Sequence, residues 1–269
     1  MKTILVATDH SEVAANAVNY AAHLAKDIAA NLVLFNVFKL SVHANNSLVS
    51  ATSMQNLKEK SENQLNELKA KIEGAFQIEV SWELGKDDTI DSLQAFMNEK
   101  GADLVVMGIE NNLTDYKLFG NTTTDAIKLM EFPLLVVPDN AVYVPIKTVS
   151  FACEPSILDP DNSLSQLKDF VKLTGSKLVV MHIMAAESEE KRKILERKIG
   201  RILSTVNHSY RYVISQRVGD GIEMGLAEYP AELLVMIPHR LGFFEAFFKG
   251  SHTSYMAVRT KLPLLVIPN

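Results

Sequence analysis

Three short segments carry groups that could bind a ligand. Asp9 follows the apolar run ILVAT, and Gly108 closes the apolar run LVVMG, where a missing Cβ lets backbone approach a ligand closely. Gly120, Asn121 and Thr122 lie at the start of TTTDAIKLM, which has the pattern of a short helix. A carboxylate can accept hydrogen bonds from sugar hydroxyls, and the amides that begin a helix bind phosphate. These residue types favour a ligand with a sugar and a phosphate.

The same residues also have purely structural interpretations. Asp9 could cap the next helix or form a turn, although Ser11 is a plausible N-cap and would leave Asp9 free for a ligand. Thr122 and Asp125 could form a variant of the capping box, with Gly120 only permitting the turn. The structural and ligand-binding roles are compatible, because a capped helix start can still present other amides to an anion.

The segments that must position these residues alternate between two patterns. Short apolar runs typical of buried strands are separated by segments with apolar residues at helical spacing. The predicted strands are ILVAT (4–8), NLVLFNVF (31–38), IEVSWELG (78–85), ADLVVMG (102–108) and LLVVP (134–138). The predicted helices are SEVAANAVNYAAHLAKDIA (11–29), LKEKSENQLNELKAKIEG (57–74), DSLQAFMNEKG (91–101) and TTTDAIKLM (122–130), with 39–56 expected to be an irregular loop. This alternation predicts an α/β fold, an open parallel sheet with helices on both faces.

The whole pattern occurs twice. FPLLVVP (132–138) recurs as LPLLVIP (262–268) at an offset of 130, and the same offset places LVVMG (104–108) on LVMIP (234–238). KTILVATDHS (2–11) matches KTVSFACEPS (147–156) at an offset of 145. We therefore expect two tandem copies of a five-stranded Rossmann-like domain, over residues 1–141 and 145–269.

Composition excludes several classes of protein. The net charge is −5, which argues against a nucleic-acid binder that relies on a basic surface. Cys153 is the single cysteine, so one chain cannot hold a disulfide framework or a cysteine-based metal cluster, and no histidine motif with metal spacing occurs. The N-terminus does not have a signal-peptide pattern, and no apolar stretch approaches the ~20 residues that span a bilayer. We expect a cytoplasmic protein without membrane segments.

At these segments the chain resembles the universal stress protein family in its tandem two-domain form. ILVATDHS, ADLVVMG, the glycine spaced after it and FPLLVVP carry the resemblance, which covers essentially the whole chain. It implies a fold like that of the adenine nucleotide alpha hydrolases. It also implies a non-catalytic regulator that binds ATP, with or without Mg²⁺, or a related adenine nucleotide in the first domain. By this resemblance, Asp9 would hold the ribose, backbone near Val37 and Phe38 would meet adenine, and Gly108, Gly120, Asn121 and Thr122 would hold phosphates.

The sequence departs from the family's phosphate motif, in which a glycine is followed by two residues, a second glycine, nine residues, and Gly-Ser/Thr. Counted from Gly108, Asn111 stands at the second glycine, Asn121 at the last one and Thr122 at the hydroxyl position. Asparagine tolerates the left-handed conformation better than most residues. We therefore expect the first site to be degraded but present.

The second copy departs further from the motif. Glu154 replaces the aspartate, and the offset of 130 puts Pro238, which has no N–H, at the place of Gly108. Gly250 and Ser251 still supply an adjacent glycine and hydroxyl. This degenerate second site is expected to bind nucleotide poorly or differently.

The last strands of the two copies, 134–138 and 264–268, are apolar and are candidates for the edge strands of their sheets. An exposed apolar edge strand must be covered, because it would otherwise pair with other chains. The resemblance implies that the copies pair through them about a pseudo-two-fold axis. A further homodimer of chains is left open. The alternative function is a stress-response scaffold that binds protein partners without nucleotide. A third is slow nucleotide hydrolysis, for which no catalytic residue can be assigned.

Overall fold

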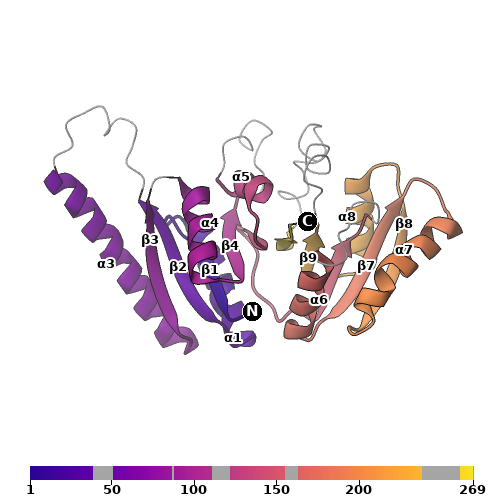
Figure 1. The fold of residues 1–269 in the computed structure, drawn as a ribbon, viewed down its shortest axis with the longest axis horizontal. Coiled ribbons are helices and arrows are strands. Elements are labelled where there is room, and N and C mark those ends of the chain that lie inside the picture. The colour runs from indigo at the N-terminus through magenta and orange to yellow at the C-terminus, as the bar shows by residue number, and fades with distance from the viewer. Residues whose placement is uncertain (39–50, 87, 111–121, 155–162, 238–260, 269) are drawn as a thin grey trace.

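The structure is a computed structural model that describes residues 1–38, 51–86, 88–110, 122–154, 163–237 and 261–268. The strands within these residues form one ten-stranded sheet, in the order β3-β2-β1-β4-β5-β10-β9-β6-β7-β8. In Figure 1 the first half of the chain lies at the left and the second half at the right, with α3 and α7 toward opposite ends of the molecule.

The elements of the first half follow the predicted alternation. Its strands are β1 (Thr3–Ala7), β2 (Asn31–Phe38), β3 (Val80–Lys86), β4 (Leu104–Ile109) and β5 (Leu134–Pro138). Its helices are α1 (Glu12–Asp27), α3 (Ala51–Phe76), α4 (Thr89–Lys100) and α5 (Thr122–Leu129).

The second half repeats this alternation. Its strands are β6 (Thr148–Ala152), β7 (Lys177–Met184), β8 (His208–Ile214), β9 (Leu233–Met236) and β10 (Leu264–Val266). Its helices are α6 (Ser163–Thr174), α7 (Glu189–Leu203) and α8 (Val218–Glu228).

The two halves have the same strand order, counted from opposite edges of the sheet. Strands pair in parallel within each half, whereas β5 and β10 pair antiparallel across the centre, with Leu135 opposite Leu265. The predicted pairing of the last strands is therefore present. It covers both apolar edges, because each last strand hydrogen-bonds to the other.

The strand register corrects the predicted alignment of the two fourth strands. Leu104 is equivalent to Leu233, because each pairs with the equivalent position of the first strand in its half. The predicted offset of 130 is thus one residue too long here. The counterpart of Gly108 is Ile237, whereas Pro238 comes one position later and lies outside the described residues.

Local signals set most of the helix ends. The hydroxyl of Ser11 caps α1 by accepting a hydrogen bond from the backbone N–H of Ala14 at 3.2 Å, as the sequence predicted. Gly101 ends α4 in the left-handed conformation at φ 71°. The start of α3 differs from the prediction, since this helix begins at Ala51 inside the expected loop. Residues 51–56 contain no glycine or proline to stop it.

Apolar residues on both faces of the sheet form the core. Neighbouring strand residues point to opposite faces, so Ile4 packs toward α1 and α3 while Leu5 packs toward α4 and α5. In the second half α6 and α7 share the face of α1, and α8 shares that of α4. None of the helices in the described part of the chain is both long and apolar enough to cross a membrane.

An acidic residue in front of the fourth strand of each half binds the start of the first strand. The carboxylate of Asp103 accepts hydrogen bonds from the backbone N–H groups of residues 2 and 3, at 2.7 and 3.0 Å. Glu232 does the same for residues 147 and 148, at 3.1 and 2.7 Å. This duplicated contact, which sequence reasoning missed, shows how closely the two halves correspond.

Candidate functional site

A pocket of about 780 Å³ lies at the carboxyl ends of β1, β2 and β4. The starts of α1, α4 and α5 and one face of α3 complete its walls. The strand order reverses between β1 and β4, and ligands of open α/β sheets bind at such a reversal, beyond the carboxyl ends of the strands. The fold therefore puts this pocket where a ligand is expected.

Four of the predicted first-site residues line this pocket together: Asp9, Val37, Gly108 and Thr122. The backbone of Phe38 ends β2, where it pairs with Lys86 of β3. The other predicted residues of the first site, Asn111, Gly120 and Asn121, lie outside the described part of the chain.

The carboxylate of Asp9 lies in the loop between β1 and α1. One of its oxygens accepts a hydrogen bond from the backbone N–H of Ser11 at 3.0 Å. Partial burial works to raise the pKa of Asp9, but the hydrogen bonds from Ser11 and the nearby charge of His10 hold it below its usual range. The carboxylate is therefore ionised at neutral pH and can accept further hydrogen bonds.

Hydrogen bonds from the neighbouring strand fix this loop. The carbonyl of Thr8 accepts a bond from the buried side-chain amide of Asn36 at 2.6 Å, and the N–H of Thr8 donates to the carbonyl of Phe35 at 2.8 Å. His10 has φ 63°, a left-handed conformation that is uncommon for residues other than glycine. Its N–H donates to the Thr8 hydroxyl at 3.2 Å, which helps to hold that conformation.

The end of β4 contacts two helices. The carbonyl of Gly108 accepts a hydrogen bond from the hydroxyl of Thr123 at 2.7 Å, which attaches the start of α5 to the strand. A Cβ at Gly108 would lie 2.7 Å from the carbonyl oxygen of Val13 in α1. Glycine is thus required here for packing between strand and helix, a role that the sequence interpretation did not include.

One face of α3 forms a wall of the pocket that sequence reasoning missed. Leu57, Lys60, Ser61 and Gln64 line the pocket. Their spacing of three, four and seven residues places them on one side of a helix. This spacing was the available signal, but the helix predicted over 57–74 was given no role in the site.

The charged groups of the pocket have both signs. Asp9 and Glu110 bring carboxylates, whereas Lys60 brings an ammonium group. No group of three or more His, Cys, Asp or Glu side chains in the described residues could hold a metal ion. A divalent cation would therefore depend on a ligand's own oxygens as well as on these carboxylates.

The first half of the chain identifies the protein family, because a family model for the universal stress protein family matches residues 1–138. The chain belongs to this family. A universal stress protein from Archaeoglobus fulgidus DSM 4304 has the same fold, with a TM-score of 0.74 at 17% identity, covering 99% of this chain and 96% of that one. No curated protein matches the chain.

Shorter members of the family match about half of this universal stress protein. A family protein from Burkholderia pseudomallei is 25% identical, with a TM-score of 0.39, covering 51% of this chain and 96% of that chain. A universal stress protein solved in complex with cAMP is 20% identical, with a TM-score of 0.40 and coverage of 51% and 96%. The family model and the fold shared with the Archaeoglobus fulgidus protein confirm the resemblance inferred from the sequence at the level of family and fold.

The second half of this universal stress protein shows only part of its predicted site. Glu154 is half-buried and follows β6 as Asp9 follows β1, while Gly250 and Ser251 lie outside the described residues. Cys153 beside it is buried, as expected for a free cysteine with a packing role, and burial raises the pKa of its thiol. The carbonyl of Cys153 is hydrogen-bonded to the ring of His182 at 2.9 Å.

Proposed function

We propose that the first half of this universal stress protein binds ATP or a related adenine nucleotide. In this proposal the protein is a cytoplasmic regulator that responds to the bound nucleotide without turning it over. The observation that carries the proposal is that Asp9, Gly108 and Thr122 line one pocket at the reversal of strand order. The pocket is therefore lined by a carboxylate, by backbone at a glycine without a side chain, and by the N-terminus of a helix.

Each part of the pocket suits one part of a nucleotide. Asp9 would accept hydrogen bonds from the ribose hydroxyls, because a carboxylate can accept about four hydrogen bonds and those from Ser11 leave some of this capacity free. The backbone of Val37 and Phe38, at the end of β2, would meet the adenine. The first amides of α5, at Thr122, would face phosphate oxygens, since the N-terminus of a helix attracts anions.

The volume and charge of the pocket also fit this ligand. About 780 Å³ lies within the range of roughly 300–1,000 Å³ that small-molecule sites occupy. Lys60 can offset part of the phosphate charge. Mg²⁺ bound to the phosphates would reduce the repulsion from Glu110, because this ion usually combines one or two carboxylates with phosphate oxygens and water. We assign no residue to nucleotide hydrolysis.

Calorimetric titration of the purified protein with ATP, ADP and cAMP tests the proposal. Asp9→Asn should weaken ATP binding by about tenfold or more, because a hydrogen bond to a charged group contributes about 1.5–3 kcal/mol. Glu99→Gln, which removes an exposed charge on α4 away from the pocket, should leave the affinity unchanged. Unchanged binding in Asp9→Asn would overturn the site.

A second candidate function is a scaffold that binds protein partners without nucleotide. Glu110 favours it, because a second carboxylate in the pocket repels a polyphosphate that arrives without a divalent cation. The titration separates the two functions when it is repeated with and without Mg²⁺. A wild-type protein that binds none of the three nucleotides in either condition would support the scaffold.

A further inference from the structure

Two buried polar side chains from neighbouring strands line the pocket at the ends of β1, β2 and β4. Thr8, just after β1, is 5% exposed, and Asn36 of β2 is 8% exposed. The parallel register that pairs Ala7 with Phe35 puts Thr8 beside Asn36, so both side chains lie on the same face of the sheet. Buried polar groups are normally hydrogen-bonded, so any capacity that these two leave unused is available to a ligand.

One hydrogen bond fixes the orientation of the Asn36 amide. Its Nδ2 donates to the backbone carbonyl of Thr8 at 2.6 Å. A carbonyl oxygen can only accept, so the amide nitrogen must face Thr8, with the amide oxygen Oδ1 on the other side. No group in the described residues donates a hydrogen bond to this Oδ1. Because Asn36 lines the pocket, Oδ1 is the acceptor that it offers to a ligand.

The hydroxyl of Thr8 is left with the complementary capacity. Its oxygen accepts a hydrogen bond from the backbone N–H of His10 at 3.2 Å. Its hydrogen has no acceptor in the part of the chain that the structure describes, so it can be donated to a ligand. This part of the pocket therefore offers an acceptor and a donor side by side.

The second half keeps the anchoring bond but not this pair. The strand registers make His182 the counterpart of Asn36 and Cys153 that of Thr8. The ring of His182 is hydrogen-bonded through Nδ1 to the carbonyl of Cys153 at 2.9 Å. The anchoring bond alone therefore does not require asparagine. The amide oxygen and the hydroxyl occur together in the half that also has Asp9.

We infer that Asn36 and Thr8 select adenine over other purines, an inference that rests on the proposed function of this pocket. The proposed nucleotide has its base at the end of β2, next to Asn36. Oδ1 of Asn36 would accept a hydrogen bond from the 6-amino group of adenine, and the Thr8 hydroxyl would donate to a ring nitrogen beside that group. Guanine and hypoxanthine carry a carbonyl at position 6. Their O6 would face Oδ1, and two acceptors cannot form a hydrogen bond.

Three nucleotides with the same ribose and triphosphate test this selection. ATP carries the 6-amino group, purine riboside triphosphate has only hydrogen at that position, and ITP has a carbonyl. Calorimetric titration of the full chain in the presence of Mg²⁺ measures the three affinities. The wild type should bind ATP about tenfold more tightly than either analogue, because each analogue leaves the buried Oδ1 without a donor.

Two variants separate the roles of the acceptor and the donor. Asn36→Ala should bring ATP and purine riboside triphosphate to within about twofold of each other, because the acceptor that distinguishes them is gone. A purely structural loss of the anchoring bond would weaken both nucleotides and leave their ratio unchanged. Thr8→Val should weaken both equally, because both keep the ring nitrogens that flank position 6.

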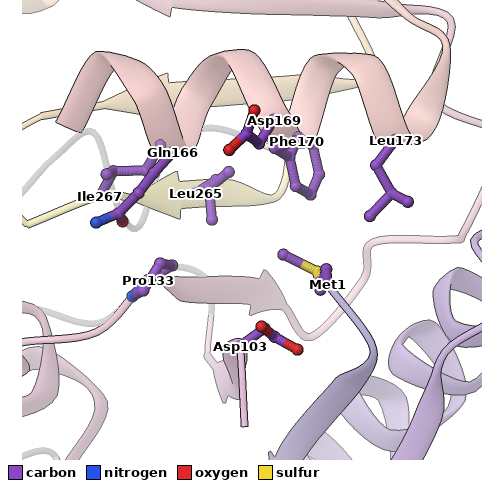
Figure 2. A pocket seen from close by; sticks show the side chains of 9 residues that line it. All are labelled: Met1, Asp103, Pro133, Gln166, Asp169, Phe170, Leu173, Leu265 and Ile267. Carbon is purple, nitrogen blue, oxygen red and sulfur yellow. The ribbon is translucent and has the colours of Figure 1, made fainter. Parts of the chain in front are cut away.

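Two control variants change groups outside the pocket. Asn16→Ala removes an amide of the same kind, which donates to the carbonyls of Pro138 and Ala141 at 2.9 and 3.0 Å. It should lower the free energy of unfolding without changing the ratio of affinities. Asp169→Asn changes the lining of a separate cavity of about 270 Å³ beside α6 (Figure 2), and it should also leave the ratio unchanged.

The outcomes distinguish this inference from the proposed function. A wild type that binds ATP no more tightly than purine riboside triphosphate would overturn the inference and leave the nucleotide site in place. The wild-type ratio in Asn36→Ala would do the same. A wild type that binds none of the three nucleotides would overturn the proposed function, and the inference with it.

Discussion

The backbone of Gly108 packs against the carbonyl group of Val13 in the first turns of α1. A Cβ at position 108 would lie 2.7 Å from that carbonyl oxygen and 2.8 Å from the Cγ1 of Val13. This contact brings the end of β4 next to the loop that carries Asp9. Gly108 matches part of the family's phosphate motif, but it also has a packing role. It allows the end of β4 and the start of α1, two walls of the pocket, to come into contact.

Gly108→Ala should consequently destabilise the protein. The new methyl group must displace backbone atoms of α1, and overpacking of this kind costs about 1–3 kcal/mol. The free energy of unfolding, measured by chemical denaturation, should fall by that amount, and ATP affinity should fall with it because α1 and its loop move away from β4. Full stability of Gly108→Ala would show that α1 can shift without cost.

Gly74→Ala is the matched control for this change. Gly74 lies inside α3, and a Cβ there meets no atom within 4 Å. Alanine in a helix interior is about 0.5–1 kcal/mol more favourable than glycine. The same substitution should therefore stabilise the protein at position 74 and destabilise it at position 108.

The fold was predictable from the sequence because several signals agree. Alternating apolar runs and helical spacing, the Ser11 cap and the Gly101 stop all predict the same elements. The register of the fourth strands was not predictable from the repeat alone. A run such as LVVMG remains apolar when it is shifted by one residue, so only the pairing of Leu233 in the sheet shows that Ile237 is the counterpart of Gly108.

The candidate site was predictable only in part. Residues at the ends of strands are identified by the rule for parallel sheets, and Asp9, Val37 and Gly108 line one pocket in the structure. Polar side chains that face a pocket have the same pattern as side chains that face water. For this reason the contribution of Lys60 and its neighbours on α3 required the tertiary structure.

Lys60→Gln should weaken the binding of ATP without changing that of adenosine. The ammonium group of Lys60 lines the pocket and would attract phosphate, but it is exposed, so solvent limits its contribution to about 1 kcal/mol, or roughly fivefold in affinity. The effect of Lys60→Gln on ATP affinity, relative to its effect on adenosine affinity, should become smaller at high salt. Calorimetric titration with both ligands measures this.

Lys58→Gln provides the control for Lys60. Lys58 is also on α3, where it pairs with Glu62 at 3.6 Å, but it does not line the pocket. Its removal makes the net charge of the same helix more negative by the same amount. Equal losses of ATP affinity in both variants would indicate a general field effect and not a contact at position 60.

Cys153 should react with thiol reagents only when the protein opens. Its side chain is 4% exposed, and burial raises the pKa of the thiol, so little reactive thiolate is present or accessible at pH 8. Labelling with iodoacetamide, followed by mass spectrometry, should be slow in buffer and fast in denaturant. Rapid labelling of the native protein would contradict the buried position.

Tyr143 should make stability depend on pH in the alkaline range. Burial, together with the hydrogen bond and the charge of Asp27, raises the pKa of its phenol above the ordinary value of about 10. Above pH 10 the unfolded chain releases this proton while the folded chain retains it, so the contribution to stability is full below that pH and declines above it. Tyr143→Phe removes the exposed hydrogen bond to Asp27, at a cost of about 0.5–1.5 kcal/mol near pH 7, together with the alkaline decline. Denaturation at pH 7, 9 and 10.5 should therefore show the wild type ahead at pH 7 and its advantage shrinking as pH rises. A constant difference in stability between the two proteins would mean that the phenol has the same pKa in the folded and the unfolded state.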